Sequence, residues 1–161
     1  MKQDKQMKRL VLAALLAALT CVGTMVIKIP SLHGYLHPGD GFVLLSGFLL
    51  GPWYGAAAAG IGSGLADLFS GYTIYVPGTL LIKALSALIA GLIYQKKNSS
   101  AYALLGGVLG ELAMAAGYFL YESAVFHEGA AAAIPGNFAQ GAAGVVISML
   151  LLPLLKKAVR R

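Results

Sequence analysis

Four ionisable side chains lie in stretches that are otherwise apolar or small: Asp40, Asp67, Lys83 and Glu111. A charge at membrane depth is costly unless it is paired, and such residues usually mark function. Lys83 is the clearest case, because it lies about 10 Å along the helix predicted from the run Val76–Gly91, VPGTLLIKALSALIAG. Two interpretations stay open: Lys83 contacts a polar ligand, or it forms a structural ion pair with Glu111 or Asp67. Asp40, in HPGDG, is in addition a candidate helix cap.

Two stripes of polar and small residues follow helical spacing near the C-terminal half of the chain. The first consists of Glu111, Ala115, Tyr118 and Glu122, and the second of Asn137, Gln140, Gly144 and Ser148. Polar stripes are unfavourable against lipid, so both should face the interior of a helix bundle. Together they predict a polar cavity that opens at one membrane face and closes before the other, where the helices are apolar.

A tyrosine-rich connection, SGYTIYVPG, contributes Tyr72 and Tyr75 over the mouth of this cavity. Tyrosines at such a place are also typical of the aromatic belt at a membrane interface. Aromatic side chains above polar groups would suit a flat, ring-containing ligand through stacking and hydrogen bonds.

The elements that must position these residues are transmembrane helices. The chain has 161 residues, of which 58% are hydrophobic and 11% charged, and its mean hydropathy is +0.78. A soluble domain usually carries about 25% charged residues, so the composition predicts an integral membrane protein with one domain over residues 1–161. Six hydrophobic segments, five of them started or ended by a proline, run over Met7–Ile29, Pro38–Gly51, Pro52–Ser70, Val76–Tyr94, Ala101–Tyr121 and Pro135–Leu155. The fold class predicted is therefore all-α, with six transmembrane helices.

Basic residues predict the orientation. Ten of the twelve lie in three places, namely residues 2–9, residues 96–97 and residues 156–161. With six spans these places share one side, which the positive-inside rule makes the cytoplasm. The prediction is N-in and C-in, with the polar cavity opening to the outside. This distribution also explains the net charge of +6 without a nucleic-acid partner.

Several chemistries are excluded or disfavoured. The chain lacks G-x-x-x-x-G-K-[ST], so it does not hydrolyse ATP through a Walker loop. Ser63 in GIGSG has no histidine on a predicted helix to act as its base, which excludes an intramembrane serine protease. His33, His37 and His127 lie in predicted loops without metal-ligand spacing, so we expect no metal and no cofactor.

Taken together, HPGDGFVLLSGFLLGP over 37–52 and GIGSGLADLFSGYTIYVPGTLLIKALSALIAG over 60–91 resemble the S components of energy-coupling factor (ECF) vitamin transporters. Small-residue pairs in the first helix, Ala13/Ala17 and Ala14/Ala18, add to the resemblance. It implies a multi-pass protein of the bacterial plasma membrane that binds a vitamin at the outer face and is not an enzyme. It also implies docking, through these alanines, on a transmembrane coupling (T) subunit that carries two cytoplasmic ATPases.

Within that family the pattern is most similar to the branch for vitamin B6 forms and hydroxymethylpyrimidine. The resemblance implies that Lys83 receives a ring acceptor, Asp67 or Glu111 takes a ring nitrogen and Tyr75 stacks. Asn137 and Gln140 would hold hydroxymethyl groups, and Asp40, Tyr72 and Tyr118 complete the predicted substrate-binding set. On this view Lys83→Met abolishes binding and leaves folding intact. A membrane assembly protein with a packed polar interior and a stand-alone solute facilitator remain the alternatives.

Overall fold

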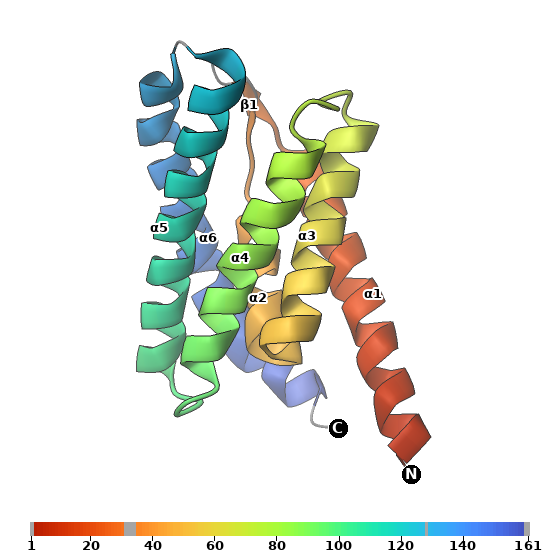
Figure 1. Ribbon diagram of the computed structural model, residues 1–161. Helices are drawn as coiled ribbons and strands as arrows, with labels where there is room; N and C mark the ends of the chain where they lie inside the picture. The colour runs from red at the N-terminus through yellow and green to blue at the C-terminus, as the bar shows by residue number, and fades with distance from the viewer. Residues whose placement is uncertain (1, 31–34, 128, 160–161) are drawn as a thin grey trace.

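The computed structural model describes residues 2–30, 35–127 and 129–159, and within these ranges it is an all-α bundle with one short β-ladder (Figure 1). Its helices are α1 (Lys2–Val26), α2 (Asp40–Leu50), α3 (Pro52–Phe69), α4 (Val76–Tyr94), α5 (Ser100–Phe126) and α6 (Ala130–Val159). Strands β1 (Ile29–Pro30) and β2 (Tyr35–Leu36) pair antiparallel in the α1–α2 connection.

Prolines and a glycine mark several of the helix boundaries. Pro52 and Pro77 occupy the first turns of α3 and α4, as predicted, because a first-turn residue needs no N–H partner. Gly51 separates α2 from α3 with a φ of 82°, a left-handed conformation that favours glycine. The predicted bounds of α4, Val76–Tyr94, agree with the structure.

Several predicted boundaries were wrong, and both ends of α1, the end of α5 and both ends of α6 differ from the prediction by three residues or more. Pro135 lies inside α6, which begins five residues earlier because the alanines from Ala130 onward are strong helix formers. Helix α5 continues beyond Tyr121 to Phe126, and α1 ends at Val26. The β-ladder was not predicted, since two-residue strands leave no periodic signal.

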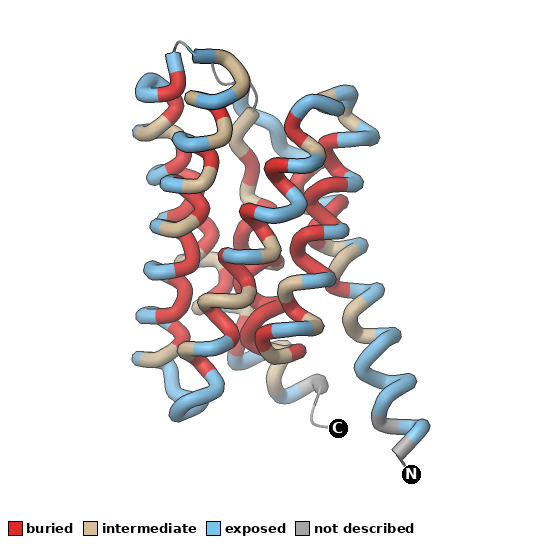
Figure 2. The backbone as a smooth tube through the Cα atoms, in the orientation of Figure 1, coloured by how far each residue is buried: buried red, intermediate tan, exposed pale blue. Residues whose placement is uncertain are grey.

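Helix α2 is the centre of the bundle and packs against α1, α3, α4 and α6. All but two of its residues, Phe42 and Leu49, are buried, whereas the neighbouring helices bury one face each (Figure 2). Helix α1 lies at the edge against α2 and α3, and its N-terminal half is exposed. The polar stripes predicted on α5 and α6 are buried, so their inward orientation is confirmed.

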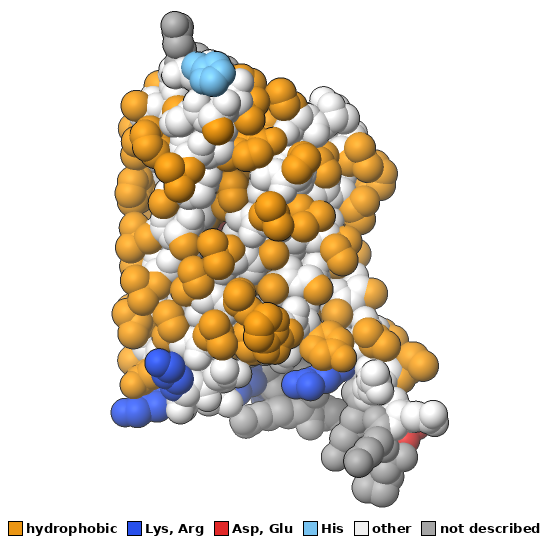
Figure 3. Space-filling view, in the orientation of Figure 1, with side chains coloured by type: hydrophobic (Ala, Val, Ile, Leu, Met, Phe, Trp, Pro, Cys, Tyr) orange, Lys and Arg blue, Asp and Glu red, His pale blue; other side chains and the backbone are white. Residues whose placement is uncertain are grey.

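The outer surface is apolar over most of its height (Figure 3). Helices α4 and α5, with Gln6–Val26 of α1 and Ala130–Lys157 of α6, are long and apolar enough to cross a membrane. Helix α2, at 11 residues, is about 16 Å long and too short to span a hydrocarbon core of about 30 Å. The two ends of the bundle differ. One end holds the start of α1, the connection between α4 and α5, and the end of α6 (Figures 1 and 3), and here Lys156 Nζ donates to Asn98 Oδ1 at 2.6 Å. The described residues of the three basic places thus share one end, while the N-in, C-in orientation stays a prediction.

Glycines allow the helices to approach closely. A Cβ on Gly55 of α3 would lie 2.5 Å from the Ser46 carbonyl oxygen of α2, and one on Gly60 would lie 2.6 Å from the Leu80 carbonyl oxygen of α4. Neither site has room for a side chain, so these glycines are packing contacts inside the bundle.

Candidate ligand-binding site

A polar cavity of about 40 Å³ lies inside the bundle, towards the end opposite the basic residues. It is enclosed by the β2 connection and by α3, α4, α5 and α6. Tyrosines and acidic or amide side chains dominate its walls, which consist of Tyr35, Leu36, His37, Asp67, Tyr72, Tyr75, Thr79, Tyr118, Glu122, Ala133, Asn137 and Gln140. The two interior stripes and the tyrosine-rich connection therefore meet at one place.

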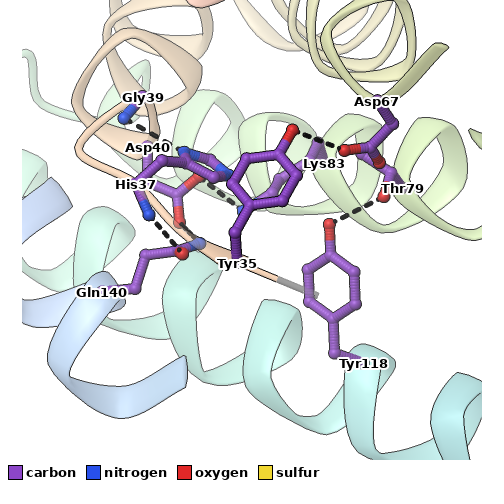
Figure 4. A network of polar contacts seen from close by, with 9 residues as sticks. All are labelled: Tyr35, His37, Gly39, Asp40, Asp67, Thr79, Lys83, Tyr118 and Gln140. Carbon is purple, nitrogen blue, oxygen red and sulfur yellow. Dashed lines mark hydrogen bonds and ion pairs between the residues drawn. The ribbon is translucent and has the colours of Figure 1, made fainter. Parts of the chain in front are cut away.

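Asp67, in the last turn of α3, binds the side chain of Tyr35, which enters the cavity from the connection between α1 and α2. Tyr35 Oη donates to Asp67 Oδ1 at 2.8 Å (Figure 4). The Tyr35 ring lies 4.8 Å from the Tyr72 ring and 5.6 Å from the His37 ring, between centroids. Burial, and then the Asp67 carboxylate, raise the pKa of the Tyr35 phenol, which keeps it a neutral donor. A ring that donates a hydrogen bond to Asp67 is thus already part of the site.

Two further tyrosines in the wall are Tyr75, the residue before α4, and Tyr118 of α5. Tyr118 Oη and Thr79 Oγ1 share a hydrogen bond of 3.0 Å, and Tyr75 Oη donates to Glu122 Oε1 at 3.0 Å. The Tyr75 and Tyr118 ring centroids are 6.4 Å apart. These hydrogen bonds fix the hydroxyls and leave ring faces along the cavity, which suits stacking.

Beneath the cavity, Lys83 forms an ion pair with Asp40, its ammonium 2.5 Å from Asp40 Oδ1, and neither side chain is exposed. Gln140 Nε2 donates to the other Asp40 oxygen at 2.7 Å, and Gln140 Oε1 accepts from the His37 backbone N–H at 3.0 Å (Figure 4). The structural pair expected for Lys83 was with Glu111 or Asp67. The structure selects Asp40 instead, because the short α2 begins at the depth of Lys83.

Close helix packing makes this arrangement possible. A Cβ on Gly144 of α6 would lie 2.7 Å from Asp40 Cβ, so a larger residue there would push Asp40 away. His37 belongs to the same unit, since its Nδ1 accepts from the Gly39 backbone N–H at 3.2 Å. Burial lowers the pKa of His37 to about 4, so its imidazole is neutral at physiological pH.

Glu111 lies beside the Asp40–Lys83 pair and interacts electrostatically with both residues, but it does not join their chain of hydrogen bonds. It is buried, and neither carboxyl oxygen has a hydrogen-bond partner among the described residues. It lines a second, largely apolar groove of about 350 Å³ between α5 and α6. Asn137 borders both this groove and the polar cavity, so the two spaces adjoin.

The nine predicted substrate-binding residues thus divide into two sets. Six line the cavity, whereas Asp40, Lys83 and Glu111 do not. The six are Asp67, Tyr72, Tyr75, Tyr118, Asn137 and Gln140. The described residues contain no cluster of three or more potential metal ligands.

Four polar lining residues were not in the predicted set: Tyr35, His37, Thr79 and Glu122. Glu122 belongs to the α5 stripe and could have been included on that spacing. Tyr35 and His37 lie in a connection that folds into the bundle, and no local pattern predicts that path. His37 was considered only as a metal ligand.

A third groove, of about 690 Å³, runs along the outer surface between α1 and α3. All four predicted docking alanines line it: Ala13, Ala14, Ala17 and Ala18. Ala14 and Ala18 are exposed, while Ala13 and Ala17 are half-buried. The alanines therefore form the floor of a shallow apolar groove on the surface.

Comparison with known proteins gives concordant findings. The model of the family "ECF-type riboflavin transporter, S component" matches residues 4–157. An uncharacterised protein from the gap 3′ region of Pyrococcus woesei is 35% identical over 141 residues, covering 86% of this chain and 95% of that protein. A solved structure, of the S component of a bacterial ECF transporter, has a TM-score of 0.80 and 25% identity, covering 97% of this chain and 99% of the other.

Proposed function

This chain belongs to the family of ECF-type riboflavin transporter S components, and we propose that its tyrosine-lined cavity binds a small ring-containing vitamin or vitamin precursor. Family membership makes it an integral membrane protein and the substrate-binding subunit of an ECF transporter, not an enzyme. The proposal concerns the ligand, the residues that contact it and the partners that complete transport.

The observation that carries the proposal is the composition of the cavity wall. Four tyrosines, two carboxylates and two amides converge on one enclosed space. Aromatic faces provide stacking for a planar ring, and the polar groups fix its orientation. The candidate ligands are riboflavin, which the family description names, and the vitamin B6 forms and hydroxymethylpyrimidine expected from the sequence.

The ligand must displace part of the protein to enter. The cavity of about 40 Å³ has room for a few water molecules, whereas small-molecule sites usually have roughly 300–1,000 Å³. Tyr35 and His37 are held from the α1–α2 connection by two hydrogen bonds, to Asp67 and Gln140. We infer that residues 35–37 move outward when the ligand binds.

We assign contact roles to the six predicted residues that line the cavity. Lys83, expected to meet a ring acceptor, has an indirect role in this proposal: with Asp40 it holds Gln140 in place through the chain of hydrogen bonds below the cavity. Asp67 remains the acceptor for a ring N–H, and Glu111 faces the adjoining groove.

The groove between α1 and α3 is the proposed docking surface for the T subunit and its two ATPases. Its alanine floor allows a partner helix to approach closely. The cavity and this groove lie on different sides of α3, because Asp67 faces the cavity while Ile61 and Leu65 line the groove. Ligand capture and docking therefore use separate surfaces.

Isothermal titration of the purified chain in detergent with riboflavin, pyridoxine and hydroxymethylpyrimidine tests the proposal. One of these rings should bind, and Tyr118→Ala should weaken binding at least tenfold. Tyr102→Ala is the matched control, because Tyr102 lies near the basic end, beside Lys97, and should keep wild-type affinity. Absence of binding by all three would favour an assembly protein, and solute movement through the isolated chain without ATP would favour a facilitator.

A further inference from the structure

We propose that the cavity selects ring compounds that carry a positive charge, held by the Asp67 and Glu122 carboxylates and by the faces of the surrounding tyrosines, and that it rejects anionic forms of the same rings. This inference rests on the proposed function and specifies the class of ligand. It follows from charge balance, from the position of two lysines and from the contacts of Tyr35.

The charge balance of the cavity is negative. Its described lining includes the carboxylates of Asp67 and Glu122 but no lysine or arginine. The nearest buried cation, Lys83, is already neutralised by Asp40. Lys28 lies on the exposed side of the site, where its ammonium donates to Ser70 Oγ at 2.5 Å. A cationic ligand would therefore reduce a charge imbalance that an anionic ligand would increase.

The cavity tyrosines already attract cations within the protein. Lys28 Nζ lies 5.0 Å from the centroid of the Tyr35 ring, and Lys83 Nζ lies 5.2 Å from that of Tyr118. Both distances are within the range of cation–π attraction, and several tyrosine faces around one space are the usual means of binding organic cations. Tyr72 and Tyr75 add two further rings to this wall.

Tyr35 shows which group the site accepts. Its ring lies among Tyr72, His37 and Lys28, and its hydroxyl donates to Asp67. When Tyr35 leaves, Asp67 loses one of its donors and keeps Thr79, and a buried carboxylate that loses a donor is less favourable. A protonated amine or ring N–H⁺ replaces the hydroxyl with a hydrogen bond in which donor and acceptor carry opposite charges, so an ion pair is added. Neutral rings can replace it only with a hydrogen bond from an uncharged donor.

The test compares compounds that share one pyridine core and differ in one substituent and in net charge: pyridoxamine, pyridoxine and pyridoxine phosphate, titrated into the wild-type chain in detergent at pH 7. Pyridoxamine should bind roughly 10- to 100-fold more tightly than pyridoxine, because its ammonium adds an ion pair with the carboxylates to the hydrogen bond that a neutral hydroxyl would form. The phosphate should not bind measurably. Asp67→Asn should reduce the preference of the cavity for pyridoxamine at least fivefold.

Asp4→Asn is the matched control, because it removes the same charge from the far end of α1. It should keep the full preference. Equal or tighter binding of pyridoxine or its phosphate would overturn the inference and leave the proposed function intact. If neither these compounds nor riboflavin nor hydroxymethylpyrimidine binds, the proposed function fails and this inference with it. The wild-type comparison decides the matter even if Asp67→Asn does not fold.

Discussion

Replacing Lys83 by methionine is the sharpest test of the polar interior. Methionine fills a similar volume but leaves the Asp40 carboxylate without its counter-charge at a position with no exposure. Removing one partner of a buried ion pair costs about 3–5 kcal/mol, because an uncompensated charge stays in a low-dielectric interior. The sequence alone suggested that Lys83→Met would lose ligand and keep its folding. The ion pair with Asp40 changes that expectation, so the variant should lose ligand and also be less stable than the wild type.

A double-mutant cycle in detergent measures the effect. Lys83→Met alone should lower the melting temperature by on the order of 10 °C, and Lys83→Met with Asp40→Asn should recover most of that loss. The control is Lys97→Met, which removes an exposed lysine and should change stability by no more than about 0.5 kcal/mol. If Lys83→Met melts like the wild type, or if the two substitutions are additive, the ion pair does not stabilise the fold and the reasoning is wrong.

Three further predictions concern docking, packing and pH. Ala14→Leu should abolish co-purification with the T subunit and leave ligand affinity unchanged, because Ala14 is exposed in the α1 groove; retained co-purification would contradict this docking surface. Gly55→Ala should destabilise the bundle by roughly 1–3 kcal/mol in denaturant titrations, since its Cβ would lie 2.5 Å from a carbonyl oxygen, whereas Gly64→Ala, with 3.6 Å to its nearest neighbour, should not. Burial lowers the pKa of the His37 imidazole from 6.5 to about 4, so below about pH 6.5 the unfolded chain binds a proton there that the folded chain does not. The free energy of unfolding therefore decreases, by about 3 kcal/mol in all, as the pH falls from about 6.5 towards 4. The melting temperature of the wild type minus that of His37→Gln should therefore decrease between pH 7 and pH 5, and a constant difference would contradict the assignment.

Periodic features of the sequence predicted much of this molecule. The α5 and α6 stripes face inward because polar groups cannot face lipid at low cost, and that rule needs no tertiary information. The bounds of α4 followed from Pro77 and from the lysines after Tyr94. Lys83 was recognised as a buried charge because it lies in the middle of a run that is otherwise apolar or small.

The partner of Lys83 could not be predicted in the same way. Its identity depends on how deep α2 begins, and that depth depends on the path of the α1–α2 connection through the bundle. This connection has no periodicity, and it carries Tyr35 and His37 into the cavity through long-range hydrogen bonds to Asp67 and Gln140. Such contacts are decided by the packed fold, so local sequence patterns do not contain them.

Mass spectrometry of small molecules released from the purified chain tests the central claim most directly. The account predicts a ring-containing vitamin or precursor at close to one molecule per chain, lost in Tyr118→Ala and retained in Tyr102→Ala. A chain that is released empty, and that then binds none of the candidate rings on titration, would contradict it.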